Sequence, residues 1–198
     1  MTTLVEEFMY PVMEDFKLNM TDGEEVISID LRKFTIVGAT TEAGTLAAPL
    51  RDRFKLKFTL ELYDEESLSS LIKGNCKKLR LNITDNAIGS LAKVSRGTPR
   101  IANGLLEWVR DYKVAKNIGI VNDDALLHSL SLRGIEPDGS TENDRKYLDF
   151  LRKQKSPVGV NTIASSININ KDTIINVIEP FLLQRNLVIK TSKGRVAA

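Results

Sequence analysis

The chain opens with a helical pattern of apolar residues. Leu4, Phe8, Val12 and Phe16 recur every four positions, which predicts a helix with one apolar face. Pro11 lies inside this pattern. Because proline cannot donate a helical hydrogen bond, we expect a kink or a break there.

Strand patterns follow this helix. An Asp-Gly pair lies between two segments of alternating side chains, which predicts a β-hairpin over residues 17–31. The apolar run at 34–39, FTIVGA, is typical of a buried parallel strand in an α/β sheet, and 55–63, KLKFTLELY, predicts a half-buried strand. Ligands bind beyond the carboxyl ends of parallel strands, so Thr40 and Thr41 are expected where chemistry takes place.

Residues from about 64 to 132 follow a helical pattern. Turn-forming residues interrupt this pattern at 82–85, 96–99 and 117–123, which predicts a small domain of four helices. The segment 134–141, GIEPDGST, is rich in turn formers. It is therefore expected to link the helical domain to the last part of the chain.

The last part of the chain predicts a winged helix. Helical patterns at about 142–153, 161–167 and 171–185 precede 187–198, which has the pattern of two short strands around a Lys-Gly turn. Three helices followed by a hairpin is the element order of a winged helix, a variant of the helix-turn-helix. The expected domain bounds are 1–61, 62–134 and 135–198.

Charge is distributed unevenly along the 198 residues. Residues 1–149 hold 20 Lys and Arg against 24 Asp and Glu, whereas 150–198 hold 8 against 2. Any polyanion is therefore expected to bind at the C-terminus. One cysteine, Cys76, and one histidine, His128, argue against an internal disulfide, a metal site or a His-based triad. We expect no membrane span and no targeting peptide, and a cytoplasmic protein.

Two arginines share the turn LRDRF at residues 50–54. An arginine here, either Arg51 or Arg53, could reach the γ-phosphate held by a neighbouring subunit, because its planar charged fork stabilises a phosphoryl group in transfer. The alternative is an ordinary surface ion pair with Asp52 or Glu42.

The motif RGTPR at residues 96–100 carries a second candidate arginine. Gly97 is expected to end one helix, Thr98 to cap the next, and Pro99 to stand at its first position. Arg100 then lies in the first turn, where the helix dipole disfavours a cation. It should therefore have an anionic partner, either a triphosphate or a structural carboxylate.

Eight segments along the chain resemble the RuvB family, the AAA+ motors of Holliday-junction branch migration. In order they are VEEFMYPVMEDF, GATT, APLRDRF, LELY, RGTPRIANGLLEWVRD, PVGVNTIASSI, DTIINVIEPFLLQ and KGR. The resemblance covers essentially the whole chain. It implies an α/β plus all-α fold: part of an AAA+ large ATPase domain, a small helical lid, and a C-terminal winged-helix head.

The resemblance also implies roles at an ATP or ADP site. Arg53 would be the arginine finger that acts in trans, Thr41 sensor 1, and Arg100 sensor 2. Tyr63 would contact the nucleotide. The segment Glu14, Asp15 and Phe16 matches a further part of the same site.

DNA and protein partners are implied in the same way. The DNA-contacting positions would be Lys171, Lys190 and Arg195, with Lys193 beside them. Phosphate contacts of this kind give affinity without sequence choice. The hairpin at 17–31 would dock on RuvA, with Met20 and Val26 as contacts. The family further implies a bacterial homo-hexamer on Holliday-junction arms, working with RuvC.

One departure from the family is large. The sequence contains no GxxxxGK[ST] loop and no Asp-Glu pair ahead of VEEF to hold Mg²⁺. We therefore expect an ATP-dependent DNA helicase or translocase at the family level, but a fragment or truncated product that is inactive alone. Glu42 stands where the family usually has arginine. The rival interpretations are a non-enzymatic winged-helix DNA-binding module and a clamp-loader-like AAA+ subunit.

Overall fold

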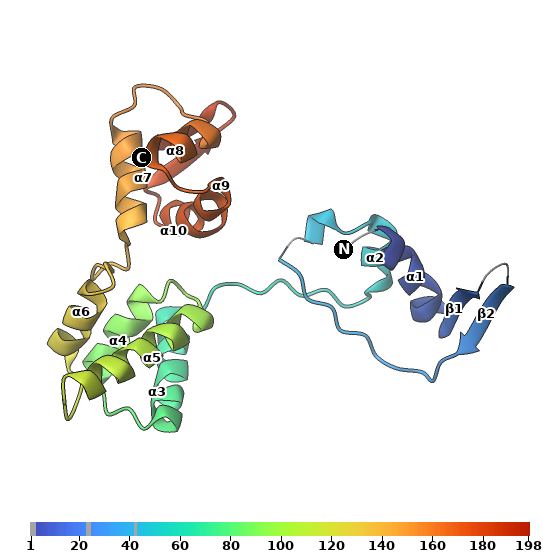
Figure 1. Ribbon diagram of the computed structural model, residues 1–198, viewed down its shortest axis with the longest axis horizontal. Helices are drawn as coiled ribbons and strands as arrows, with labels where there is room; N and C mark the ends of the chain where they lie inside the picture. The colour runs from blue at the N-terminus through green and yellow to red at the C-terminus, as the bar shows by residue number, and fades with distance from the viewer. Residues whose placement is uncertain (1–2, 23–24, 42) are drawn as a thin grey trace. The chain divides into compact units, whose positions relative to one another are not determined.

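A computed structural model of the chain describes residues 3–22, 25–41 and 43–198, without the side chains of 3–4, 21–22 and 25–26 (Figure 1). The chain divides into two units, Met1–Leu60 and Glu61–Ala198. Each unit is described by itself. No helix among the described residues is long and apolar enough to cross a membrane.

The N-terminal unit consists of short elements. They are the helix α1 (Thr3–Glu14), the antiparallel strands β1 (Lys17–Asp22) and β2 (Glu25–Asp30), the 3-10 turn η1 (Ala43–Thr45) and the helix α2 (Ala48–Arg53). The hairpin is therefore confirmed. Of the kink or break expected at Pro11, the break is wrong, because α1 continues through Pro11 to Glu14.

The two further strands expected in this unit do not form. Residues 34–39 and 55–63 lie outside any strand, and Val37 is 89% exposed and Leu60 92% exposed. A parallel strand is held by hydrogen bonds to neighbouring strands. Among the described residues of this unit, β1 and β2 pair only with each other. The two apolar segments therefore have no partner strand in the described part of the chain.

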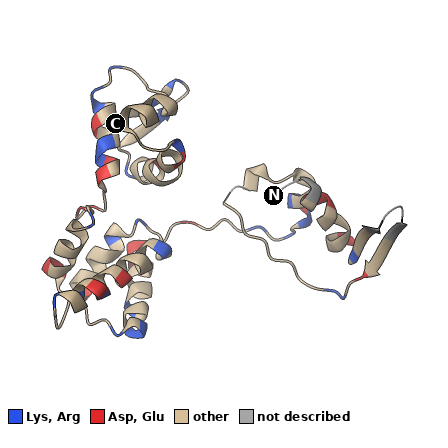
Figure 2. Ribbon diagram, in the orientation of Figure 1, with Lys and Arg blue, Asp and Glu red and all other residues tan. Residues whose placement is uncertain are grey.

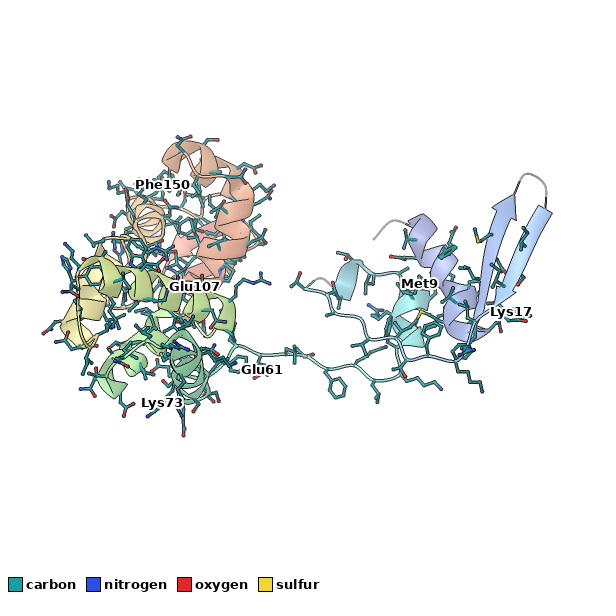
Figure 3. The ribbon with its side chains drawn as sticks, turned by 60° about the horizontal axis from the view of Figure 1, so that its bottom comes forward. Met9, Lys17, Glu61, Lys73, Glu107 and Phe150 are labelled. Atoms are coloured by element: carbon teal, nitrogen blue, oxygen red, sulfur yellow. The ribbon has the colours of Figure 1, made fainter. Side chains whose placement is uncertain are left out.

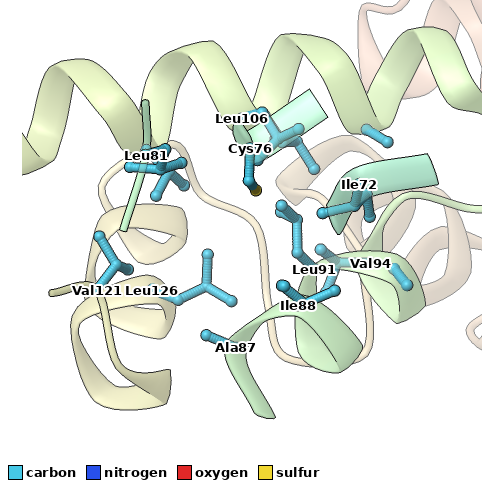
Figure 4. Close-up of a cluster of buried hydrophobic side chains, with 14 of the residues drawn as sticks. Ile72, Cys76, Leu81, Ala87, Ile88, Leu91, Val94, Leu106, Val121 and Leu126 are labelled. Carbon is cyan, nitrogen blue, oxygen red and sulfur yellow. The ribbon is translucent and has the colours of Figure 1, made fainter. Parts of the chain in front are cut away.

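The lid is a bundle of four helices, as predicted. They are α3 (Glu65–Leu79), α4 (Asp85–Val94), α5 (Pro99–Ala115) and α6 (Asp123–Ser131). Asp64, Thr84 and Asn122 cap three of them, since each side chain accepts a hydrogen bond from a first-turn amide. The core between the helices includes Leu91 and Leu106, which are fully buried, and also encloses Cys76 (Figure 4).

The winged helix is also confirmed. Its elements are α7 (Glu142–Arg152), α8 (Val160–Ile167), α9 (Lys171–Thr173), the π-helical turn η2 (Ile174–Ile178), α10 (Glu179–Gln184), and the strands β3 (Val188–Thr191) and β4 (Gly194–Ala197). Its own core contains Tyr147, Ile163 and Ile178, all buried. In the hairpin, Lys190 pairs with Arg195 across the two strands.

The helical segment 171–184 changes its hydrogen-bonding pattern in the middle. The Glu179 N–H bonds the carbonyl of Ile174, five residues back, instead of the usual four. Pro180 follows and has no N–H to donate. Such π-turns are rare and often occur at functional positions.

Candidate functional site

Arg53 ends helix α2 and is held by three neighbours. Its Nη1 donates to the Pro49 carbonyl at 2.7 Å, and its Nη2 lies 2.7 Å from the Glu14 carboxylate. The guanidinium carbon lies 4.3 Å from the centre of the Tyr10 ring, a cation–π contact. Helix α1 therefore positions the arginine that the sequence singled out.

The ion pair at Arg53 differs from the one that the sequence suggested. Asp52 bonds Lys57 at 3.4 Å instead, and Glu42 lies outside the described residues. The partner carboxylate, Glu14, is 54% exposed, and the Arg53 side chain is 23% exposed. An ion pair this open to water contributes about 0–1 kcal/mol to stability. Arg53 can therefore exchange Glu14 for another anion at little cost.

Other nucleotide candidates of the N-terminal unit lie close to Arg53. Phe16 and Arg53 line one pocket of about 350 Å³, and the rings of Phe16 and Phe34 meet edge to face at 5.7 Å. Asp15 lies exposed at the end of α1. Thr41 is exposed, and no described contact joins it to Arg53. The structure thus gathers Glu14, Phe16 and Arg53, but not Thr41.

Tyr63 lies against the RGTPR loop. Its N–H donates to the Gly97 carbonyl at 2.9 Å, and its side chain is half exposed. Gly97 has φ of +68°, and a Cβ there would lie 2.8 Å from the Cβ of Leu62. Only glycine fits this approach. The loop differs from the expectation in one respect: Thr98 stands at the N-cap position of α5, but its hydroxyl donates to the Arg96 carbonyl at 3.2 Å and caps nothing.

Arg100 is the second residue of α5 and is exposed. Its side chain makes no ion pair or hydrogen bond with any residue that the structure describes. The sequence analysis allowed a structural carboxylate as the partner of Arg100. No carboxylate among the described residues takes that role. A cation at a helix N-terminus is destabilising unless an anion neutralises it. An anion bound here would neutralise this charge.

Arg96 makes contacts that the sequence did not predict. Its Nη2 lies 2.6 Å from the Asp144 carboxylate and 2.7 Å from the Gly139 carbonyl, and its Nε also donates to that carbonyl at 3.1 Å. The guanidinium covers the Phe181 ring at 3.8 Å. Arg96 belongs to the lid and its three partners to the winged-helix region. The residue thus ties the lid to the winged helix.

The Arg96 junction is largely buried. Asp144 is fully buried and Arg96 is 11% exposed. Asp144 also accepts hydrogen bonds from the backbone and hydroxyl of Thr141, both at 2.6 Å, in the capping box of α7. A pocket of about 290 Å³ beside this junction is lined by Tyr63, Arg96 and Arg185, among others. Figure 3 draws the side chains of this unit and labels Lys73, Glu107 and Phe150.

The wing cations of the DNA prediction converge on a carboxylate. Glu179 is fully buried and accepts from Lys190 at 2.6 Å and from the Nε of Arg195 at 2.8 Å. The Tyr147 hydroxyl donates to it at 3.0 Å. Burial would raise the pKa of Glu179, but the hydrogen bonds from Arg195, Lys190 and Tyr147 outweigh burial and lower the pKa. Lys171 and Lys193 are exposed and form no ion pair with a residue that the structure describes, whereas Lys190 is 43% exposed and paired.

The hairpin of the N-terminal unit exposes apolar side chains. Met20 is 51% exposed, and its cross-strand partner Ile27 is 48% exposed. Leu18 and Ile29 form the neighbouring pair, and Ile29 is 44% exposed. Val26 pairs with Thr21, one position along the strand from the pair that Met20 forms with Ile27. The side chain of Val26 lies outside the described residues. Ile27, which the sequence reasoning missed, is thus the neighbour of Met20.

A lid built around RGTPR and followed by a winged helix is the architecture of AAA+ motor ATPases that carry a DNA-binding head. Three family models match the chain in order: the Holliday junction DNA helicase RuvB P-loop domain at residues 1–60, the RuvB AAA lid domain at 63–136, and the RuvB C-terminal winged helix domain at 138–198. The chain belongs to the RuvB family. This confirms the resemblance and the fold class, and excludes an unrelated regulator or a clamp-loader-like subunit.

Relatives and solved structures agree with this result. The Holliday junction branch migration complex subunit RuvB of Helicobacter pylori (strain P12) is 44% identical over 198 residues, which cover 98% of this chain and 59% of the relative. The Helicobacter acinonychis (strain Sheeba) protein of the same description is 43% identical. The Thermotoga maritima RuvB Holliday junction branch migration motor matches with a TM-score of 0.84 at 36% identity, covering all of this chain and 63% of that one. The chain thus spans about 59% of the length of the curated relatives it matches.

Proposed function

We propose that this chain supplies the lid, the winged helix and the finger-bearing part of the large domain of a RuvB-type motor. Such a motor hydrolyses ATP to drive DNA through a Holliday junction. The observation that carries the proposal is the buried Arg96 junction, because it links the segment that would sense nucleotide to the segment that would bind DNA. A rigid link of this kind is what converts a local nucleotide change into movement of DNA.

The residues that would contact nucleotide have exposed side chains or exchangeable partners. Arg100 has no anionic partner among the described residues, and Tyr63 lies beside the loop that carries it. Arg53 would leave Glu14 to contact the γ-phosphate held by a neighbouring subunit, and Thr41 would act as sensor 1. ATP, ADP and Mg²⁺ would be held mainly by a phosphate loop, and residues 1–198 contain no such motif. We therefore propose that the chain alone does not hydrolyse ATP.

The DNA side rests on the charge of the winged helix. Residues 150–198 hold 8 Lys and Arg against 2 Asp and Glu, and Figure 2 marks the basic positions on this domain. Lys171 at the start of α9 and Lys193 in the wing turn are exposed and able to meet phosphates. Contacts of this kind do not depend on base sequence, as a translocating motor requires.

The remaining partners follow from the family. The face of the hairpin that carries Met20 and Ile27 would dock on RuvA, because exposed apolar side chains in a pair of this kind mark interaction surfaces. We further propose a homo-hexameric ring, cooperation with RuvC, and a cytoplasmic location in a bacterium. The three domains would have the bounds 1–61, 62–134 and 135–198.

Duplex binding tests the DNA side directly. The chain is titrated onto a labelled duplex of about 20 base pairs over a range of salt concentrations. The double variant Lys171→Gln, Lys193→Gln should bind more weakly, and the slope of log K against log salt should fall by about 0.9 for each phosphate that the variant no longer neutralises. Lys73→Gln, which removes an exposed lid lysine, is the matched control. Unchanged affinity and slope in the double variant would exclude the winged helix as the DNA surface.

A further inference from the structure

One buried carboxylate organises the wing. Glu179 is fully buried, yet both of its oxygens accept hydrogen bonds from wing cations: Oε1 from the Nε of Arg195 at 2.8 Å, and Oε2 from Lys190 at 2.6 Å and Arg195 Nη2 at 3.3 Å. Lys190 and Arg195 are cross-strand partners in the hairpin, so one carboxylate holds both strands. A buried charge is tolerated only when it is paired and hydrogen-bonded in this way.

The backbone places Glu179 for this task. The π-turn at 174–178 ends at Glu179, directly before Pro180, and the extra residue in this turn shifts the side chains that follow it around the helix. The hydroxyl of Tyr147 from α7 completes the set of donors. Helix α10, helix α7 and the hairpin therefore meet at one carboxylate.

The hairpin is held a second time through its backbone, close to its turn. The N–H of Arg195 donates to the Val158 carbonyl at 2.9 Å, and the Val158 N–H returns a bond of 3.0 Å. A Cβ at Gly194 would lie 2.5 Å from that same carbonyl, so only glycine allows the approach. Arg195 is consequently fixed by both its main chain and its side chain.

This arrangement changes the role of Arg195. Its side chain is 18% exposed, and its Nε and Nη2 both face Glu179, whereas Lys193 in the turn is exposed. We propose that Glu179 is a positioning residue for DNA binding: it fixes the hairpin through Arg195 and Lys190, so that Lys193 and the exposed part of Lys190 present their charge to the phosphates. The proposal rests on the proposed function and assigns Arg195 to the scaffold of the wing.

A purely electrostatic account and the positioning account predict opposite changes in DNA affinity for Glu179→Gln. Glu179→Gln removes a negative charge from a domain that binds a polyanion, so electrostatics alone predict tighter binding. Positioning predicts weaker binding, because the amide loses the charge-assisted hydrogen bonds that hold the hairpin. The direction of the change therefore decides between the two accounts.

The experiment uses the full chain and a labelled duplex of about 20 base pairs at low salt. Glu179→Gln should weaken binding about tenfold. The matched control is Glu142→Gln, which removes an exposed carboxylate from α7 of the same domain and leaves Lys146 without its partner. The control should bind slightly more tightly than the unmodified chain. Binding by Glu179→Gln as tight as that of the control would overturn the proposal.

A second variant keeps the proposal testable if Glu179→Gln does not fold. Arg195→Lys retains the charge but loses the fork that spans both oxygens of Glu179. It should weaken binding without changing the salt slope, because the same number of phosphates is neutralised. Hydrogen exchange at the amides of Val158 and Arg195 should accelerate at the same time. Unchanged affinity and unchanged exchange would overturn the positioning role.

The experiment distinguishes failure of the proposed DNA function from failure of the positioning role. If the unmodified chain does not bind duplex at low salt, the proposed DNA function is wrong and the positioning role is wrong with it. If the unmodified chain binds and the two variants bind equally well or better, only the role of Glu179 is wrong.

Discussion

Arg53 and Arg96 each contact a backbone carbonyl, a carboxylate and an aromatic ring, but their two ion pairs differ in exposure to water. Each donates to a backbone carbonyl at 2.7 Å and covers an aromatic ring, at 4.3 Å for Arg53 and 3.8 Å for Arg96. Each also pairs with a carboxylate, at 2.7 Å and 2.6 Å. The two carboxylates differ in solvent exposure: Glu14 is 54% exposed and Asp144 is fully buried.

Exposure determines what each pair contributes. The Coulomb energy of the Glu14 pair is screened by solvent, so its loss changes stability little. The Asp144 pair lies in a low-dielectric interior, where removal of one partner leaves an uncompensated buried charge. The Arg53 pair can therefore be broken at little cost, as the proposed finger role requires, whereas breaking the Arg96 pair is costly.

The largest effect is expected at the Arg96 junction. Arg96→Ala should lower the stability of the unit 61–198 by about 3–5 kcal/mol, because Asp144 would remain buried without a cation. Arg53→Ala is the matched control and should change stability by no more than about 1 kcal/mol. Urea unfolding followed by the fluorescence of Trp108 reports the lid, and hydrogen exchange reports each unit separately. Similar losses of stability for both variants would contradict the different contributions assigned to the two ion pairs.

A smaller effect is expected from the loop that presents Arg96. Gly97→Ala should cost about 1–3 kcal/mol, because φ is +68° and the new Cβ would meet the Leu62 Cβ at 2.8 Å. Gly38→Ala is the counterpart near Arg53, where the new Cβ would meet the side chain of Phe54 at 3.2 Å. We expect a smaller loss of stability there because that ring can shift. Hydrogen exchange of the two segments measures both, and a larger loss at Gly38 would reverse the comparison.

The parts of the fold that could be predicted from sequence are local. The helices of the lid and the winged helix follow apolar periodicity, and their ends follow caps such as Asp64 and Thr84. The strands expected at 34–39 and 55–63 do not form, because a strand depends on a partner far away in sequence. Alternation alone shows only which residues would share a face.

Arg53, Arg100 and Lys193 could be proposed from the sequence because they lie in short motifs, LRDRF, RGTPR and KGR. Their roles in binding nucleotide and DNA stay predictions. Arg96 and Glu179 could not be singled out, since their importance comes from burial against Asp144, Phe181 and Arg195. Burial of a charge is a property of tertiary packing, and exposed and buried charges look the same in a sequence.

The most direct test is a pair of double-mutant cycles in the full chain. One cycle combines Arg96→Ala with Asp144→Ala, and the other combines Arg53→Ala with Glu14→Ala, with local stabilities measured by hydrogen exchange. The coupling energy should be about 2 kcal/mol or more for the buried pair and below about 1 kcal/mol for the exposed pair. Equal couplings, or a stronger one between Arg53 and Glu14, would contradict the division into a costly Arg96 pair and a releasable Arg53 pair.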